Sequence, residues 1–307
     1  MSTNYSEAYQ RRFGGIARLY GQQALALFSQ ARICVIGLGG VGSWAAEALA
    51  RTGIGSITLV DMDDICITNI NRQIHATGRH VGMAKTEIMA ERILAINPEC
   101  RVGCIDNFIT PDNVADILDG DFSYVIDAID QIRAKAALIA YCRRYKIPVV
   151  TTGGAGGQID PSRITVVDLA KTIHDPLAAR LRARLARDFG LKKNSKGKLG
   201  IDCVFSSEQL VYPDMDGGVC TSGNYASGSK YASGSKYASG SKRMDCTTGL
   251  GAATMVTATF GFVAVSHLLK KMLAKAVRNS TESLSAVMTP ARSFEMPVAS
   301  PARIPIH

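Results

Sequence analysis

The chain has 307 residues, of which 47% are hydrophobic, 20% are charged and 7% are aromatic. This composition can bury a large core, which excludes a protein that is disordered throughout. Its 35 lysines and arginines exceed its 26 acidic residues and give a net charge of +9. The charge favours a polyanionic partner such as nucleic acid, without indicating a fold.

Eight cysteines are scattered along the chain, and no two of them form a Cys-x-x-Cys pair. A zinc site built from paired cysteines is therefore excluded. Several cysteines lie in apolar runs, where a free thiol behaves as a small hydrophobic side chain. Residues 1–12 are polar and lack the apolar stretch of a secretion signal, so we expect a reducing, cytoplasmic location.

From residue 31 onward, short runs of β-branched residues alternate with helical stretches. This alternation is typical of an α/β fold in which helices cover a doubly wound, Rossmann-like and mostly parallel sheet. Predicted strands cover residues 33–36, 56–61, 101–105, 124–127 and 148–152. Predicted helices cover residues 42–52, 83–96 and 132–145, with a short helix after Thr110 and Pro111.

The second half of the chain is less regular, and the alternation stops at a glycine-rich stretch after Thr152. Three copies of Tyr-Ala-Ser-Gly-Ser-Lys run from Tyr225 to Lys242, and a repeat of this composition cannot bury a core. We therefore divide the chain into four parts. They are an N-terminal helical segment (1–30), a nucleotide-binding Rossmann-like part (31–152), a substrate-binding and dimerisation part (153–275) with a flexible loop (221–245), and a disordered tail (276–307).

A basic helix is predicted within the second half. Asp175 and Pro176 supply its N-cap and first residue, and Gly190 ends it. Its expected apolar stripe comprises Leu177, Leu181, Leu185 and Phe189. Residues 171–198 contain nine basic and two acidic residues, a charge of +7 that fits either a solvated helix face or a nucleic-acid surface. The candidate contacts to nucleic acid are Arg180, Arg184, Arg187, Lys192, Lys193, Lys196 and Lys198.

Residues 249–269 form a stretch of 21 residues without a formal charge, followed by two lysines. The length would suffice to span a bilayer. The stretch also contains threonine, serine, histidine and glycine, and most of its residues are small. We expect a buried or dimer-interface helix, with a membrane-spanning helix as the alternative.

A glycine-rich turn, Gly37-Leu38-Gly39-Gly40-Val41-Gly42, follows the first predicted strand and opens a helix. In this position the helix N-terminal amides can bind phosphate. Asp61 follows Gly42 by 19 residues at the end of the second strand, where a carboxylate can bind the hydroxyls of a ribose. These two features fit NAD and ATP equally well.

Further polar residues separate the two nucleotides. A triphosphate needs cations around its β and γ groups, whereas a dinucleotide needs none beyond the second strand. The chain offers Arg72 and Lys85 there, and Asp130 after the fourth strand supplies an oxygen ligand suited to Mg²⁺. Each residue alone is a weak signal, but their order and context favour ATP with Mg²⁺. The full candidate set is Gly37, Gly39, Gly40, Gly42, Asp61, Asp63, Asn69, Arg72, Gln73, Lys85 and Asp130.

This set resembles the signature of the ubiquitin-activating-enzyme-like adenylating superfamily, which includes the ThiF, MoeB and HesA proteins. Within the superfamily, four segments resemble the branch that dehydrates threonylcarbamoyladenosine in tRNA. They lie at residues 12–15, 41–51, 151–158 and 193–198, and the likeness extends from about residue 11 to residue 274 outside the repeat.

The resemblance implies ATP-dependent dehydration of N6-threonylcarbamoyladenosine in tRNA to its cyclic form, by adenylation followed by ring closure. It also implies that the four glycines and Asp61 bind the nucleotide, and that Arg72, Lys85 and Asp130 are catalytic, with Asp130 holding Mg²⁺. The basic residues of 180–198 would bind tRNA. Since relatives pair as homodimers, a homodimer is expected, and a cysteine desulfurase is a possible further partner.

Other functions stay open at this point. Adenylation of a ubiquitin-like or sulfur-carrier protein is the main alternative, although sulfur-carrier activators often hold zinc in cysteine pairs that this chain lacks. A nicotinamide dehydrogenase would leave the residues from Asn69 to Asp130 without a role. The position of an arginine that relatives extend into the partner subunit falls on Gly15, so Arg11, Arg12 and Arg18 are the remaining candidates.

Three cysteines and one histidine are further candidates for chemistry. Cys203, Cys220 and Cys246 are candidate acyl or sulfur acceptors, although a structural role is favoured because the sequence indicates no neighbour that would lower a thiol pKa. Among the histidines, only His75 is expected near the nucleotide, since it directly follows Arg72 and Gln73 in the chain.

Overall fold

The computed structural model describes residues 5–213, 218–221 and 250–287. The repeat at 225–242, the predicted loop around it and Cys246 lie outside the described residues. The chain divides into two compact units, residues 1–269 and residues 270–307.

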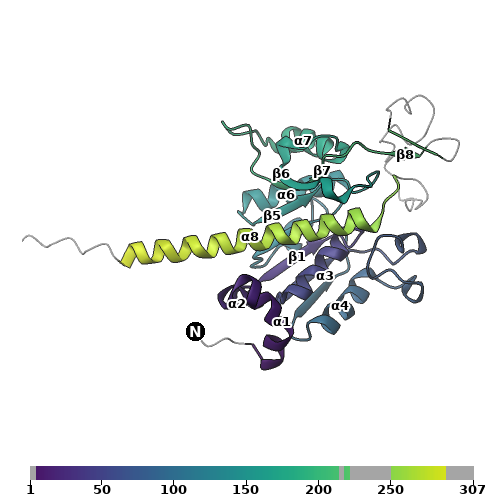
Figure 1. The fold of residues 1–307 in the computed structure, drawn as a ribbon. Helices are drawn as coiled ribbons and strands as arrows, with labels where there is room; N and C mark the ends of the chain where they lie inside the picture. The colour runs from purple at the N-terminus through teal and green to yellow at the C-terminus, as the bar shows by residue number, and fades with distance from the viewer. Residues whose placement is uncertain (1–4, 214–217, 222–249, 288–307) are drawn as a thin grey trace, which may run out of the picture. The chain divides into compact units, whose positions relative to one another are not determined.

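A seven-stranded sheet forms the centre of the first unit, with strand order β3-β2-β1-β4-β5-β7-β6 (Figure 1). All neighbouring strands are parallel except β6, which runs antiparallel to β7. The strands are β1 Arg32–Ile36, β2 Ser56–Val60, β3 Arg101–Ile105, β4 Tyr124–Asp127, β5 Val149–Thr152, β6 Ile164–Asp168 and β7 Asp202–Ser206. The predicted α/β class is confirmed, and the five predicted strands agree with β1 to β5 to within one residue.

The sheet continues past the boundary that the sequence indicated after Thr152. Strand β5 pairs with β7, so residues on both sides of that boundary belong to one sheet. A separate pair of short strands, β8 Tyr212–Pro213 and β9 Val219–Cys220, lies outside it.

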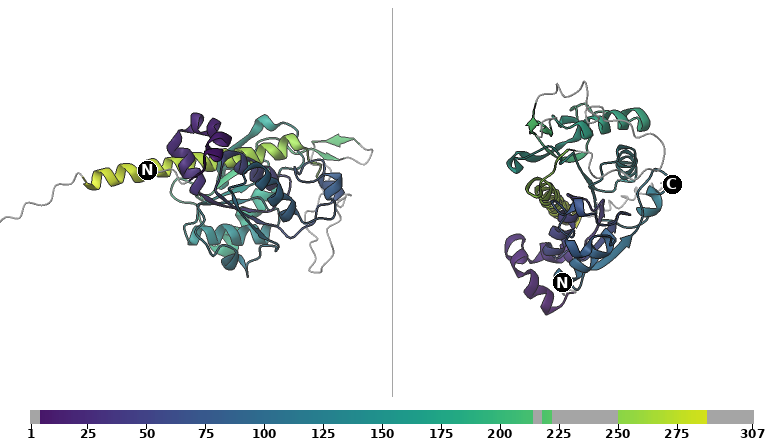
Figure 2. Two further views of the ribbon diagram at one scale, coloured as in Figure 1. Left: turned by 90° about the horizontal axis from the view of Figure 1, so that it is seen from below. Right: turned by 90° about the vertical axis from the view of Figure 1, so that its right-hand side faces the viewer.

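Helices flank the sheet (Figure 2). Helices α3 and α4 pack together, and α6 packs against both α5 and α7. The helices are α1 Glu7–Tyr20, α2 Gln22–Gln30, α3 Gly42–Thr52, α4 Lys85–Ile96, α5 Val114–Ile117, α6 Ile132–Arg144, α7 Pro176–Phe189 and α8 Thr254–Val287. Short 3₁₀ turns are η1 Ile67–Asn69, η2 Gly78–His80, η3 Pro161–Arg163 and η4 Leu169–Lys171.

Helix α4 begins two residues later than predicted. Gly82 has a φ of +87°, and Ala84 is extended and forms a β-bridge with Asp64. The chain is therefore not helical before Lys85.

Helix α7 has the predicted ends. The Asp175 side chain accepts a hydrogen bond from the Ala178 amide, and Gly190 takes the left-handed conformation after the last turn. Leu181 and Leu185 are buried, but Phe189, expected in the same stripe, is 41% exposed. The chain turns at Gly190, and Leu191 packs against the core cluster that contains Leu181 and Leu185.

The first half of α8 explains the uncharged stretch at 249–269. Phe260 and Leu268 are fully buried, as expected for a buried helix. A Cβ on Gly261 would lie 2.7 Å from the Val41 carbonyl oxygen at the start of α3, so the two helices approach more closely than a larger residue would allow. Among the described residues, no helix combines the length and the hydropathy needed to cross a bilayer.

The second unit begins at Lys270, and its described part is the remainder of α8, which ends at Val287. The prediction of a disordered tail from residue 276 is wrong for residues 276–287, which are helical. Residues 272–276, Met-Leu-Ala-Lys-Ala, are strong helix formers and continue the helix past the two lysines.

Candidate nucleotide site

The predicted glycine turn links β1 to α3 in a conformation that requires glycine. Gly37 has a φ of +87°, and a Cβ on Gly42 would lie only 1.8 Å from the Gly37 carbonyl oxygen. A Cβ on Gly37 would lie 2.9 Å from Ile129 Cγ2 in the loop after β4. The two ends of the turn are therefore close together, and the turn packs against the loop that carries Asp130.

Helix α3 begins directly after this turn. Its N-cap residue is Val41, whose side chain cannot accept a hydrogen bond from the helix amides. Uncapped amides at a helix N-terminus, together with the helix dipole, favour an anionic ligand. The turn therefore has the geometry expected for phosphate binding.

Asp61, Asp63 and Lys85 lie together beside the turn. Lys85 Nζ is 2.7 Å from Asp63 Oδ2 and 3.9 Å from Asp61 Oδ1. Asp61 also accepts hydrogen bonds from the Leu38 amide at 2.6 Å and the Asp63 amide at 2.9 Å. Asp61 thus ties the end of β2 to the glycine turn and places a carboxylate beside it.

Burial affects Asp61 and Asp63 differently. Asp61 is 8% exposed, and this burial raises the pKa of its carboxyl group, an effect that the Lys85 ammonium and the two backbone amides oppose. The Asp63 side chain is 54% exposed, whereas the Lys85 side chain is 6% exposed, so an anionic ligand that takes the place of Asp63 would keep the buried ammonium paired.

The loop with Asn69, Arg72 and Gln73 packs against the same turn. A Cβ on Gly40 would lie 3.2 Å from Arg72 Cγ, which places the arginine side chain next to the glycines. The Arg72 guanidinium donates to the Thr68 carbonyl at 2.8 Å, and Asn69 Oδ1 accepts from the Cys66 amide at 3.0 Å. Gln73 is buried, and its Oε1 has no hydrogen-bond partner among residues 5–213, 218–221 and 250–287.

Helix α8 holds this loop from the other side, a contact that the sequence did not indicate. Thr254 Oγ1 donates to the Asn71 carbonyl at 2.6 Å. The Arg72 carbonyl accepts from Trp44 Nε1 at 2.9 Å and from Thr257 Oγ1 at 3.4 Å. The main chain at Arg72 is therefore held between α3 and α8 by contacts that do not involve the Arg72 side chain.

Asp130 lies on the loop between β4 and α6, at the same edge of the sheet as the glycine turn. Its side chain is exposed, and within the described residues its carboxylate has no protein partner. The parallel pairing of β1, β2 and β4 brings their carboxyl ends to one edge. The structure thus gathers all the predicted nucleotide residues there, although it shows direct contacts only within the two groups described above.

The predicted tRNA residues form a separate group on α7 and the following loop, exposed except for the half-buried Arg184. Arg184 and Arg187 both pair with Asp188, at 2.8 Å and 2.6 Å, a pairing that the charge count could not show. In the loop, Asn194 Oδ1 accepts from the amides of Lys196 and Lys198 at 2.9 Å and 3.0 Å. The four lysines at 192, 193, 196 and 198 are exposed around this turn.

The remaining candidates have structural surroundings. Cys203 is buried in β7, where burial raises the pKa of its thiol and disfavours a nucleophilic role. Cys220 lies half-buried in β9. Arg11 pairs with Glu7 at 2.6 Å, Arg12 donates to the Ile96 carbonyl at 3.2 Å, and Arg18 is exposed on α1.

His75 is 1% exposed, and neither ring nitrogen has a hydrogen-bond partner in the part of the chain that the structure describes. Burial lowers its pKa to about 3, and the positive charges of Lys85, His80 and Arg92 add to this effect. In the unfolded chain the pKa is near 6.5, so the unfolded state binds a proton first as the pH falls. Between about pH 6.5 and pH 3, His75 therefore makes the folded state less stable with each step toward acid.

Replacing His75 with phenylalanine should remove this loss of stability. The ring fills a similar volume, and no hydrogen bond is lost. Below pH 6, each unit of acidification should lower the unfolding free energy of the wild type by about 1.4 kcal/mol more than that of the variant. Urea unfolding at pH 7, 6 and 5 measures it, and a difference that stays constant with pH would contradict the assignment.

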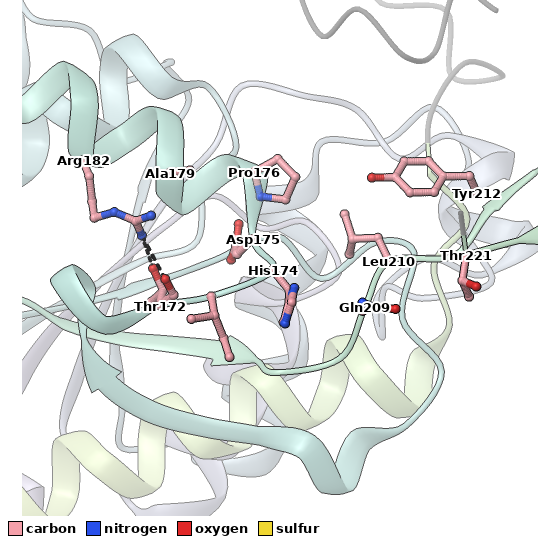
Figure 3. A pocket seen from close by; sticks show the side chains of 11 residues that line it. Thr172, His174, Asp175, Pro176, Ala179, Arg182, Gln209, Leu210, Tyr212 and Thr221 are labelled. Carbon is pink, nitrogen blue, oxygen red and sulfur yellow. Dashed lines mark hydrogen bonds between the residues drawn. The ribbon is translucent and has the colours of Figure 1, made fainter. Parts of the chain in front are cut away.

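A pocket of about 400 Å³ lies where α7 begins (Figure 3). Its charged side chains already have protein partners, since Arg182 donates to Thr172 Oγ1 and Asp175 accepts from the Gly154 amide at 3.0 Å. The other lining residues are Ile173, His174, Pro176, Ala179, Gln209, Leu210, Tyr212 and Thr221. Because it contains none of the predicted site residues, we assign it no part in nucleotide binding.

The doubly wound sheet, the glycine turn and the adjacent acidic and basic side chains define a nucleotide-binding α/β protein. The profile of the ThiF family matches residues 9–303. The chain belongs to the ThiF family.

Among known proteins, the chain is similar over nearly its whole length to tRNA threonylcarbamoyladenosine dehydratases. It is 68% identical to that of Escherichia coli K12 over 91% of this chain and 99% of the relative. It is 53% identical to that of Haemophilus influenzae over 87% of this chain and 95% of the relative. These matches confirm the resemblance that the sequence motifs indicated.

Solved structures agree with this finding. The crystal structure of the E. coli dehydratase in complex with ATP has a TM-score of 0.77 and 64% sequence identity, and covers 89% of this chain and 98% of that one. The same enzyme in complex with AMP also has a TM-score of 0.77, with 65% identity over 89% of this chain and 98% of that one.

Proposed function

We propose that the protein is an ATP-dependent enzyme that dehydrates N6-threonylcarbamoyladenosine in tRNA to its cyclic form. The observation that carries this proposal is the similarity to dehydratases over nearly the full length of both chains, with an ATP complex among the similar structures. The Asp61, Asp63 and Lys85 cluster beside the glycine turn supports the use of a nucleotide.

The reaction needs an activated carboxyl group. A carboxylate is a poor acyl electrophile because its leaving group would be oxide. Attack of a carboxylate oxygen on the α-phosphorus of ATP forms an acyl adenylate and releases pyrophosphate. The neighbouring carbamoyl group then attacks the activated carbonyl, closes the ring and expels AMP, and the short tether between the reacting groups favours this step.

The residues of the site supply position and charge. The amides of the glycine turn face the phosphates, and Asp61 binds the ribose. Lys85 leaves Asp63 to neutralise phosphate charge, while Arg72 acts from the other side of the turn, helped by the amide side chains of Asn69 and Gln73. Preorganised charges of this kind stabilise the transition state without costly rearrangement.

Asp130 is proposed to hold Mg²⁺ on the nucleotide. An exposed carboxylate without a protein partner at the phosphate edge fits this role, because Mg²⁺ usually takes one or two carboxylates and fills its other positions with phosphate oxygens and water. When bound, the ion neutralises charge on the phosphates.

The assembly is proposed to be a homodimer that binds tRNA through residues 180–198. Large apolar side chains are exposed beside the nucleotide site, among them Ile67 at 66% and Met255 at 63%. A second subunit would cover such residues, and light scattering in solution tests this.

A ligase or cyclase classification follows from the proposed reaction. A cysteine desulfurase partner stays a prediction from the sequence.

Nucleoside mass analysis tests the function. Incubation of the protein with ATP, Mg²⁺ and tRNA carrying N6-threonylcarbamoyladenosine should remove one water from the modified nucleoside. An ATP analogue with a methylene between the α- and β-phosphates should block the reaction, whereas one with a methylene between the β- and γ-phosphates should support it. An unchanged nucleoside, together with adenylation of a carrier protein's C-terminus, would favour the alternative.

A further inference from the structure

A buried ion pair, which no motif indicated, joins the two ends of the loop that carries Asp130. Lys135 Nζ lies 3.0 Å from Asp127 Oδ2, and both side chains are 0% exposed. Asp127 is the last residue of β4, and Lys135 lies in the first turns of α6. Thr151 Oγ1 donates to the same Asp127 oxygen at 2.6 Å, so the pair is also tied to β5.

The pair fixes the main chain next to Asp130. Lys135 Nζ donates to the Ile129 carbonyl at 2.9 Å, and Asp127 Oδ1 accepts from the Ile129 amide at 3.3 Å. On the other side of Asp130, Gln131 Oε1 accepts from the Ala134 amide at 2.7 Å and caps α6. Asp130 therefore lies between two anchored residues while its own carboxylate faces solvent.

Stability alone does not account for such a pair. Burying two charges costs free energy that their attraction repays only in part, and apolar residues of similar volume often stabilise a fold equally well. Burial raises the pKa of Asp127, and the Lys135 ammonium opposes that effect. The hydrogen bonds of the pair restrict the loop at residues 128–131 to one main-chain conformation. Ile129 in that loop also lies against the glycine turn, since a Cβ on Gly37 would be 2.9 Å from Ile129 Cγ2.

We propose that Lys135 is a positioning residue that, through Asp127 and the Ile129 carbonyl, sets where the Asp130 carboxylate meets Mg²⁺ on bound ATP. The inference rests on the proposed role of Asp130. It adds a residue that does not itself touch the nucleotide.

The test uses the double variant Lys135→Met with Asp127→Asn in the full-length protein. Asparagine keeps an acceptor oxygen for the Ile129 amide, and its amide nitrogen can donate to Thr151 Oγ1 once that hydroxyl rotates. Methionine keeps an unbranched chain, so no buried charge is left alone. Calorimetry measures ATP affinity with Mg²⁺ and with a chelator. Mg²⁺ should raise ATP affinity less in the double variant than in the wild type, and the ratio of affinities with and without Mg²⁺ should fall about 10-fold to 100-fold. Losses of this size are typical when a residue that supports a metal ligand is removed. ATP affinity without Mg²⁺ and the melting temperature should stay near the wild-type values.

A second readout follows the loop directly. Amide hydrogen exchange should quicken at residues 128–131 in the double variant and stay unchanged in the other loops. The matched control is His267→Gln, which removes a 2.8 Å contact with Asp202 at the amino end of β7, on the opposite edge of the sheet. This control should leave both readouts unchanged.

Three results would overturn the proposal. One is a Mg²⁺ gain in the double variant within about twofold of the wild type, and the other is unaltered exchange at 128–131. A wild-type protein whose ATP affinity does not respond to Mg²⁺ would also overturn it. None of these measurements uses tRNA, so a failure to dehydrate the nucleoside would contradict the proposed function without deciding this inference.

Discussion

Replacing Asp130 with alanine should lower the ATP-dependent dehydration rate by at least about 100-fold while the protein keeps its fold. The side chain is exposed and has no protein partner among the described residues, so its removal breaks no contact and opens no cavity. Its proposed contribution lies in holding Mg²⁺ against the phosphates. Product formation at saturating ATP measures the loss, and circular dichroism with thermal melting checks the fold.

Arg72→Ala should give a loss of similar size for a related reason. Among the described residues, the guanidinium bonds to the Thr68 carbonyl and to Asn71 Oδ1, whereas the contacts that fix the loop use the Arg72 main chain. Asp64→Ala is the matched control, since this exposed carboxylate lies one residue beyond Asp63 and has no proposed role. Wild-type turnover in either active-site variant would refute the site assignment, and tighter binding of NAD than of ATP would refute the class.

The first five strands were predictable because short runs with β-branched residues alternate with recognisable helices up to Thr152. Strands β6 and β7 were not predicted. Strand β6 has the strand-like composition Ile-Thr-Val-Val-Asp, but no α-helix separates it from β5, so it falls outside the regular alternation. Strand β7 pairs with β5 from 50 residues further along the chain. No local pattern specifies a pairing between strands so far apart.

The nucleotide residues were predictable where the backbone or the charge demands a residue type. Gly37 and Gly42 illustrate this, since the turn admits no side chain at either position. Lys135 was missed because a lysine within an alanine-rich helix has the pattern of a solvated residue. Only the packing of α6 on β4 reveals that its ammonium is buried against Asp127.

For the basic surface, the positions of the arginines on the helix were predictable from the sequence, but their ion pairs were not. The sequence correctly placed Arg180, Arg184 and Arg187 on a helix away from its buried leucines, but Asp188 pairs with two of them. Exposed pairs of this kind contribute little to stability, so the arginines can exchange the carboxylate for a phosphate at low cost. The pairing therefore does not argue against a tRNA-binding surface.

Changing Arg180, Arg184 and Arg187 together to glutamate should weaken tRNA binding on the order of 100-fold and leave ATP affinity unchanged. Phosphate contacts release counterions, so wild-type affinity should fall steeply with salt, and losing three such contacts should reduce the slope of log affinity against log salt by about three. Leu181 and Leu185, which hold α7 to the sheet, are untouched, so the fold should persist. Filter binding at several salt concentrations measures the slope, with Arg163→Glu on η3 as a control for general loss of charge. An unchanged affinity, or an equal loss in the control, would assign residues 180–187 to a solvated helix face.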